Sequence, residues 1–73
     1  MIYGTYGKWT IKVENEKKVQ FYDNTNLRSY IIEYTVIPQG IIVDSVDIIN
    51  ASIPYGAVKK SHQLIKKYQK LSE

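Results

Sequence analysis

The chain has 73 residues and no cysteine, and its ten lysine and arginine residues against seven acidic residues give a net charge of +3 at pH 7. This length allows one domain, and we take residues 1–73 as a single domain. The lack of cysteine excludes disulfides and thiolate metal sites. No apolar run is long enough to span a membrane, and the N-terminus lacks the pattern of a signal peptide. We therefore predict a cytoplasmic protein without membrane contacts.

The positive charge is concentrated in the C-terminal part of the chain. Residues 1–53 hold five basic and six acidic residues, whereas residues 54–73 hold five lysines against Glu73 alone. A contact with a negatively charged partner is therefore expected in the C-terminal segment.

The first elements along the chain are a short arm and a β-hairpin. Residues 1–7 contain two glycines and two tyrosines, and we interpret them as an N-terminal arm. Residues 8–14 alternate, with Trp9, Ile11 and Val13 on one face, which predicts a strand with one buried face. Residues 17–22 alternate again after a polar turn, so the two segments are expected to pair.

Two further strands are predicted, and both are apolar on each of their faces. Residues 29–37 are rich in β-branched and aromatic side chains, a turn at Pro38 follows, and residues 41–49 form the next strand. Strands of this kind are central in a sheet or are covered by another element or molecule. We therefore predict a homodimer, with a self-association face formed by Ile31, Ile37, Ile42 and Val46.

The C-terminal segment changes to a helical period. In residues 55–71 the apolar side chains recur at helical spacing with lysines opposite them, which predicts an amphipathic helix. Ser52 is the expected N-cap and Pro54 the expected first-turn residue. The sequence thus predicts an α+β fold, with a four-stranded antiparallel meander over residues 8–49 and one C-terminal helix packed on one face.

The sequence offers little material for catalysis, cofactor binding or metal binding. The stretch YGTYGKWT at residues 3–10 lacks the glycine spacing of a phosphate loop and leads into a strand instead of a helix. His62 is the one histidine, and its position predicts an exposed helix flank. Asp44 and Asp47 point to opposite faces of their predicted strand. We predict no catalytic residue, no cofactor, no metal site and no enzyme activity.

Five lysines of the predicted helix are the clearest candidates for contact with a polyanion or a partner. No acidic residue interrupts them, so they present a continuous positive stripe to DNA, RNA, an acidic protein surface or a membrane. A solvated helix face and a favourable interaction with the helix dipole explain them equally well. The five residues are Lys59, Lys60, Lys66, Lys67 and Lys70.

Two functional hypotheses follow from the sequence. The first is a small non-catalytic regulator or inhibitor that acts by stoichiometric binding to a protein partner. It rests on the missing reaction centre and on the apolar residues left over in the third and fourth predicted strands. The alternative is a nucleic-acid-binding protein that uses the lysine-rich face of the helix.

Overall fold

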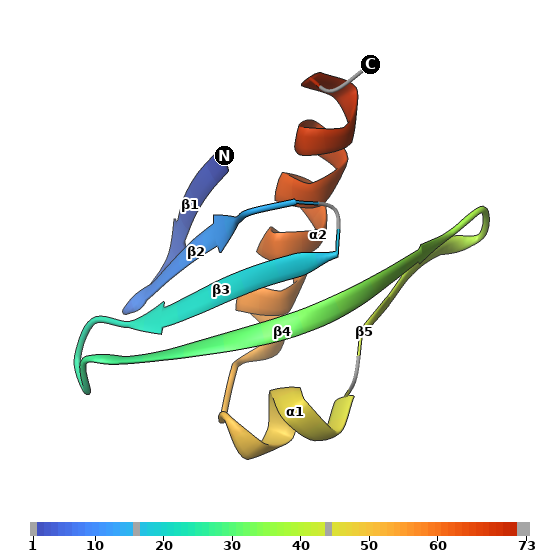
Figure 1. Ribbon diagram of the computed structural model, residues 1–73. Coiled ribbons are helices and arrows are strands. Elements are labelled where there is room, and N and C mark those ends of the chain that lie inside the picture. The colour runs from blue at the N-terminus through green and yellow to red at the C-terminus, as the bar shows by residue number, and fades with distance from the viewer. Residues whose placement is uncertain (1, 16, 44, 72–73) are drawn as a thin grey trace.

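The computed structural model describes residues 2–15, 17–43 and 45–71. In these ranges the chain forms one antiparallel sheet of five strands in the order β1-β2-β3-β4-β5 and two helices (Figure 1). The α+β class, the antiparallel sheet and the C-terminal helix are confirmed, but the sheet has five strands where four were predicted. The elements are β1 (Ile2–Tyr6), β2 (Trp9–Val13), β3 (Lys18–Asp23), β4 (Arg28–Ile37), β5 (Gly40–Val43), α1 (Ser45–Asn50) and α2 (Tyr55–Leu71).

The additional strand is β1, and it lies in the segment that was predicted to be an arm. A tight two-residue turn with Gly7 in its first central position joins β1 to β2. Gly7 has a φ of +56°, which glycine adopts at no steric cost. Gly4 lies against Leu64 of α2, where a Cβ atom would be 2.7 Å from Cδ1 of the leucine. One glycine therefore makes the turn, and the other lets the helix approach the strand.

The predicted strand over residues 41–49 is wrong in its second half, because β5 ends at Val43 and α1 follows. In the β4–β5 register, a longer strand would place Asp47 opposite Tyr30 on the face toward the core. Burying an unpaired carboxylate there would be costly. The helix removes this conflict, since Ile48 packs against the core while Asp47 stays exposed.

Ser52 terminates α1 and does not cap α2, which corrects the predicted N-cap. Its φ is +56°, and its N–H donates to the carbonyl oxygen of Ile49 at 3.0 Å. The N–H of Ile53 donates to the carbonyl oxygen of Ile48 at 3.1 Å, which completes a Schellman motif. The first helical hydrogen bond of α2 is accepted by the carbonyl of Pro54.

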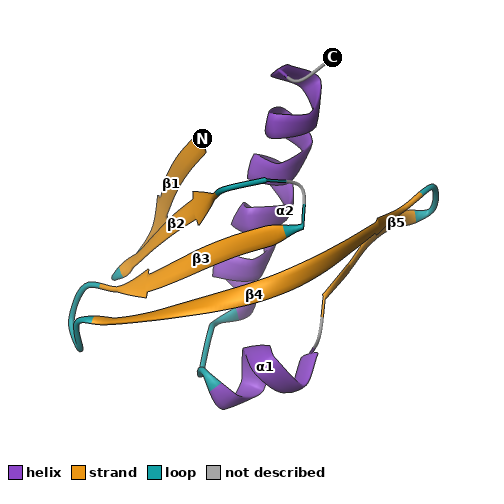
Figure 2. Cartoon of the chain, in the orientation of Figure 1, coloured by secondary structure: helices purple, strands orange, loops and turns teal. Residues whose placement is uncertain are grey.

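The core lies between one face of the sheet and α2, which crosses behind the strands in Figure 2. The strands that α2 mainly contacts are β1 and β2. Phe21, Ile11 and Ile65 are completely buried in it. Tyr6 of β1 lies over Gly56 in the first turn of α2, where a Cβ atom would overlap the tyrosine ring. Neither helix of the described residues has the length and apolar content needed to cross a bilayer.

Candidate functional site

The lysines of α2 lie where the helical period placed them. Four are exposed, while the buried residues of the helix face the sheet: Lys59, Lys66, Lys67 and Lys70. Lys60 is half-buried, and its side chain passes beside Gly4 of β1. Within the described part of the chain, none of the five forms an ion pair. Their charge is therefore available to an anionic partner.

A second candidate surface lies where β4 passes α1. Two open hollows of about 500 and 400 Å³ share Ile31 and Asp47, and we call them together the β4–α1 groove. Ile31 and Ile42 in this groove are 60% and 54% exposed. Exposed aliphatic side chains that gather on one surface are typical of a protein-binding site. The remaining lining residues are Ser29, Tyr30, Ile32, Glu33, Thr35, Val43, Asn50 and Ala51.

Two exposed carboxylates, Glu33 and Asp47, lie in the groove beside the isoleucines. Neither forms an ion pair with another described residue. Lys18 stands opposite Glu33 in the β3–β4 ladder, but the two side chains are not joined by an ion pair. The molecule therefore combines a basic helix with a groove that is both apolar and acidic.

The four residues predicted to form a self-association face do not share one strand face. Ile31 and Ile42 lie in the groove, and Ile37 is half-buried at the end of β4. Val46 is exposed on α1 instead of on a strand. Ile49, three residues further along the same helix, is 72% exposed. The exposed apolar side chains are thus divided between the sheet and α1.

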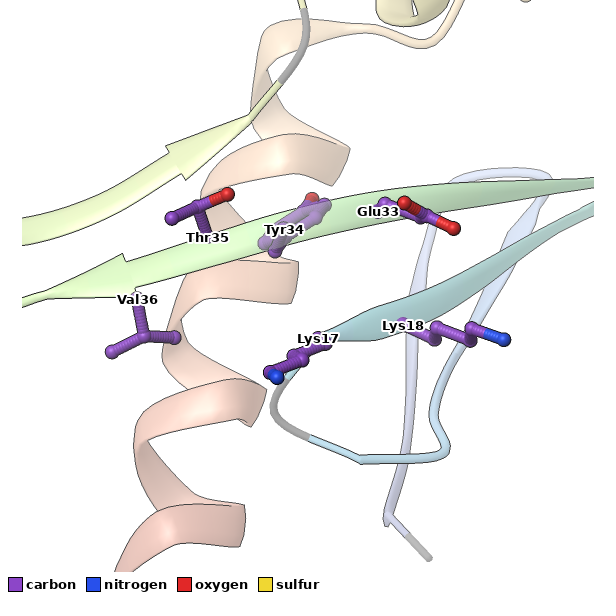
Figure 3. A pocket seen from close by; sticks show the side chains of 6 residues that line it. All are labelled: Lys17, Lys18, Glu33, Tyr34, Thr35 and Val36. Carbon is purple, nitrogen blue, oxygen red and sulfur yellow. The ribbon is translucent and has the colours of Figure 1, made fainter.

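A further hollow of about 600 Å³ lies where β4 continues past Lys18, the first residue of β3 (Figure 3). It is lined by Lys17 and Lys18 at the start of β3 and by residues 33–36 of β4. The N–H of Tyr34 donates to the carbonyl oxygen of Lys17 at 2.6 Å, and this bond marks the end of the β3–β4 pairing. Because Glu33 lies beside the two lysines, the hollow has charges of both signs and favours neither an anion nor a cation.

Asp23 is a buried carboxylate that holds the β3–β4 turn. It accepts hydrogen bonds from the N–H groups of Thr25 and Asn26 at 2.9 and 3.1 Å and from the side-chain amide of Asn26 at 2.8 Å. The ammonium group of Lys8 lies 3.1 Å from its Oδ2 atom. Burial would raise the pKa of Asp23, but the bonds from Asn26, Lys8 and Thr25 outweigh it and lower the pKa to about 2.

His62 is half-buried against Tyr34, which corrects its predicted position on an exposed flank. The two rings meet edge to face with centroids 5.5 Å apart. The Nε2 atom of His62 is buried and has no hydrogen-bond partner in the part of the chain that the structure describes. Burial, with a smaller contribution from the charge of Lys66, lowers the pKa of His62. The neutral imidazole is thus the form that the fold favours.

Ser61, next to this histidine, is completely buried and fully engaged. Its hydroxyl donates to the carbonyl oxygen of Val58 and accepts from the phenol of Tyr34, both at 2.5 Å. Burial, partly offset by this bond, raises the pKa of Tyr34 to about 12. The cluster therefore contains hydroxyl groups that a substrate in solvent does not reach. The described residues contain no group of three or more side chains arranged to hold a metal ion.

No protein-family model, curated protein or solved structure matches this chain. The basic face of α2 and the β4–α1 groove are therefore the observations from which a function is inferred.

Glu33, Asp47 and Ile49 are surface residues to which the sequence assigned no role. Asp47 carried a signal, because a carboxylate within a strand that is apolar on both faces conflicts with that strand. Strand alternation placed Glu33 on the same face as Ile31 and Ile37, but its position in the groove depends on how α1 packs beside β4.

Proposed function

We propose that this protein is a small non-catalytic regulator or inhibitor that acts by stoichiometric binding to a protein partner. The observation that carries the proposal is the β4–α1 groove, in which Ile31 and Ile42 remain more than half exposed. Complete burial of such a side chain contributes about 1.5–3 kcal/mol. A partner that covers both therefore gains a substantial part of its affinity from this groove.

The size of the domain adds support to this proposal. A chain of 73 residues buries a comparatively small share of its surface, so its stability depends on efficient use of apolar side chains. Two isoleucines left in solvent contribute little to the isolated fold. A contact outside the chain gives them a role, and the polar residues around them resemble the rim of an interface.

Binding of DNA or RNA is the second candidate function, and one observation favours it. The five lysines of α2 form no ion pair with any described residue, so each is available to a phosphate. This face lies on α2, and the groove lies between β4 and α1. The two functions are therefore separable by mutation.

The protein-binding proposal is tested by isolating the tagged chain from its own cells and measuring the stoichiometry of the complex by native mass spectrometry. Ile42→Glu and Ile31→Glu are expected to remove the partner. Thr5→Glu is the matched control, because it adds the same charge at an exposed position on an edge strand at the other end of the sheet. A complex that survives both isoleucine substitutions would contradict the proposal.

The alternative is tested by titrating labelled DNA and RNA at several salt concentrations. The protein-binding proposal predicts a Kd weaker than about 100 μM at low salt and no dependence on salt. Tight, salt-dependent binding that disappears on charge reversal of Lys59, Lys66 and Lys70 would replace the first proposal with the second.

A further inference from the structure

We infer that the β4–α1 groove takes an extended segment of the partner, with alternating basic and apolar side chains, which adds to the free edge of β4 as a strand. This inference rests on the proposed function and names the chemistry of the partner. Three features of the groove support it: the open edge of β4, the exposed isoleucines and the two carboxylates.

The first feature is an unpaired strand edge. β4 pairs with β3 through residues 28–33 and with β5, on its other side, through residues 34–37. The first part of β4 therefore has no strand on the side of β5 and α1 among the described residues. Such an edge is a template for strand addition where no element covers it, and a hollow of about 400 Å³ lies between residues 29–32 of β4 and the residues Asp47, Asn50 and Ala51.

The hydrogen-bonding direction of this edge follows from one bond. The N–H of Tyr34 donates to Lys17 of β3, so the main-chain groups of alternate residues on β4 point toward β3. The main-chain groups of Ser29 and Ile31 then point the other way, toward α1. Across that side they form no backbone hydrogen bond with another described residue. They offer two N–H and two carbonyl groups to an incoming strand.

The side chains along the edge define what that strand carries. Ile31 and Glu33 lie on the face of β4 away from α2, whereas Tyr30 and Ile32 lie on the face toward the core. An added strand alternates in the same way. Its residues on the core side meet apolar neighbours, and its residues on the outer side meet Glu33 and Asp47.

The carboxylates of the groove favour basic side chains at the outer positions of the added strand. Neither hollow of the groove is lined by a basic residue, and Asp47 lines both, so the groove attracts lysine or arginine and repels an acidic segment. Glu33 adds a second carboxylate, although Lys17 and Lys18 lie near it on its other side. A second copy of this chain is a poorer match. Its own edge strands, β1 and β5, have the sequences IYGTY and GIIV, which contain no basic residue. The observations therefore favour a different chain with a basic and apolar strand.

The inference is tested by NMR titration of the ¹⁵N-labelled protein with the capped hexapeptide KIKVKI. We expect the largest shift changes at the amides of Ser29 and Ile31, with slower hydrogen exchange at both. The charge-reversed peptide EIEVEI is expected to bind about tenfold more weakly, since it loses two favourable charge pairs and gains two unfavourable ones. In an antiparallel addition the N–H groups that face Ser29 and Ile31 belong to the outer lysines of the peptide, so KIKVKI methylated on the backbone nitrogen of its central lysine is expected to lose most of the binding.

Variants of the protein sharpen the result. Glu33→Lys and Asp47→Lys are each expected to lower the affinity for KIKVKI about threefold. Glu14→Lys is the matched control, because it makes the same charge change at the end of β2 and leaves the affinity unchanged. Equal binding of KIKVKI and EIEVEI, shift changes centred on α2, or no binding of any peptide would overturn the inference. Concentration-dependent shifts of Ser29 and Ile31 without peptide would overturn it in favour of a second copy.

The two levels of the proposal fail separately. If the cellular complex is lost with Ile42→Glu but KIKVKI does not bind, the partner uses the groove in another way and only the strand-addition inference is wrong. If the complex is insensitive to Ile31→Glu and Ile42→Glu, the groove is not the binding surface. The proposed function then loses the observation on which it rests and is contradicted.

Discussion

β1–β3 and the region formed by β4, β5 and α1 differ in how much of their apolar surface the chain itself covers. In β2 each inward side chain is buried, and the outward positions between them hold Thr10 and Lys12. β3 has the same pattern around Val19 and Phe21. In β4, by contrast, the outward Ile31 is exposed, and so is Ile42 on the neighbouring β5. The inward faces of β2 and β3 are thus completed within one chain, although Tyr3 and Tyr6 of β1 are exposed, whereas the second region exposes aliphatic side chains on β4 and β5.

The two regions also differ in charge. α2, which covers β1 and β2, carries five lysines without an ion pair among the described residues, and the groove beside β4 carries Glu33 and Asp47. The proposed function thus assigns stability and recognition to different parts of this small domain. Substitutions in the first region should change stability, and substitutions in the second should change binding.

The largest expected effect is in the completed region. Phe21→Ala removes a fully buried ring that meets Trp9 edge to face with centroids 6.5 Å apart. The lost burial and the cavity left behind are expected to lower the free energy of unfolding by about 3–5 kcal/mol. Urea denaturation followed by tryptophan fluorescence measures this change. A loss below about 1 kcal/mol would show that this core is not the main source of stability.

The completed region is also where the sequence was most informative. Trp9, Ile11 and Val13 alternate without exception, and the period of residues 55–71 is helical throughout, so local pattern and tertiary burial agree. β1 was missed because the reason for Gly4 lies in α2, sixty residues away along the chain at Leu64. No local pattern carries that information.

The groove was less accessible to prediction for a related reason. The surplus of apolar residues in 29–37 and 41–49 was visible in the sequence, and Ile31, Ile42 and Val46 among them are exposed. The shape of that surface was not visible, because it depends on the change from strand to helix after Val43. The cost of burying Asp47 opposite Tyr30 disfavours a longer strand and so favours that change.

The next largest effect concerns the contact between β1 and α2. Gly56→Ala normally stabilises a helix by up to about 1 kcal/mol, but here the new Cβ overlaps the ring of Tyr6. We expect a loss of about 1–3 kcal/mol in the free energy of unfolding. In a Tyr6→Ala background the same substitution is expected to become stabilising. A double-mutant cycle in urea measures this reversal of sign, and its absence would contradict the packing of Tyr6 on Gly56.

A smaller effect is expected from pH. The fold lowers the pKa of His62, so the unfolded chain binds its proton more readily than the folded chain. Stability is therefore fully present above the ordinary histidine pKa of about 6.5 and is lost as the pH falls through the lowered value. Thermal unfolding between pH 7.5 and 5 measures the decline, and His62→Gln is expected to flatten it.

Asp23 causes a second decline in stability, at a lower pH than the decline caused by His62. Because its pKa is lowered to about 2, its contribution is present above the ordinary value of 3.8 and is lost as the pH falls from there toward 2. Asp23→Asn should remove this acid limb and leave the decline between pH 7.5 and 5 unchanged. If His62→Gln instead removed the acid limb, the assignment of the two groups would be wrong.

The smallest expected effect on stability is in the groove. Ile31→Thr and Ile42→Thr replace exposed β-branched side chains with others that suit a strand, so the free energy of unfolding should change by less than about 0.5 kcal/mol. The same substitutions are expected to weaken the binding of KIKVKI in the groove, which the NMR titration measures. Sedimentation equilibrium at high micromolar concentration tests the homodimer predicted from the sequence separately, and a monomeric wild-type chain would contradict it. A stability loss above about 1 kcal/mol would show that these isoleucines serve the fold itself, and the division between a completed region and a binding region would then be wrong.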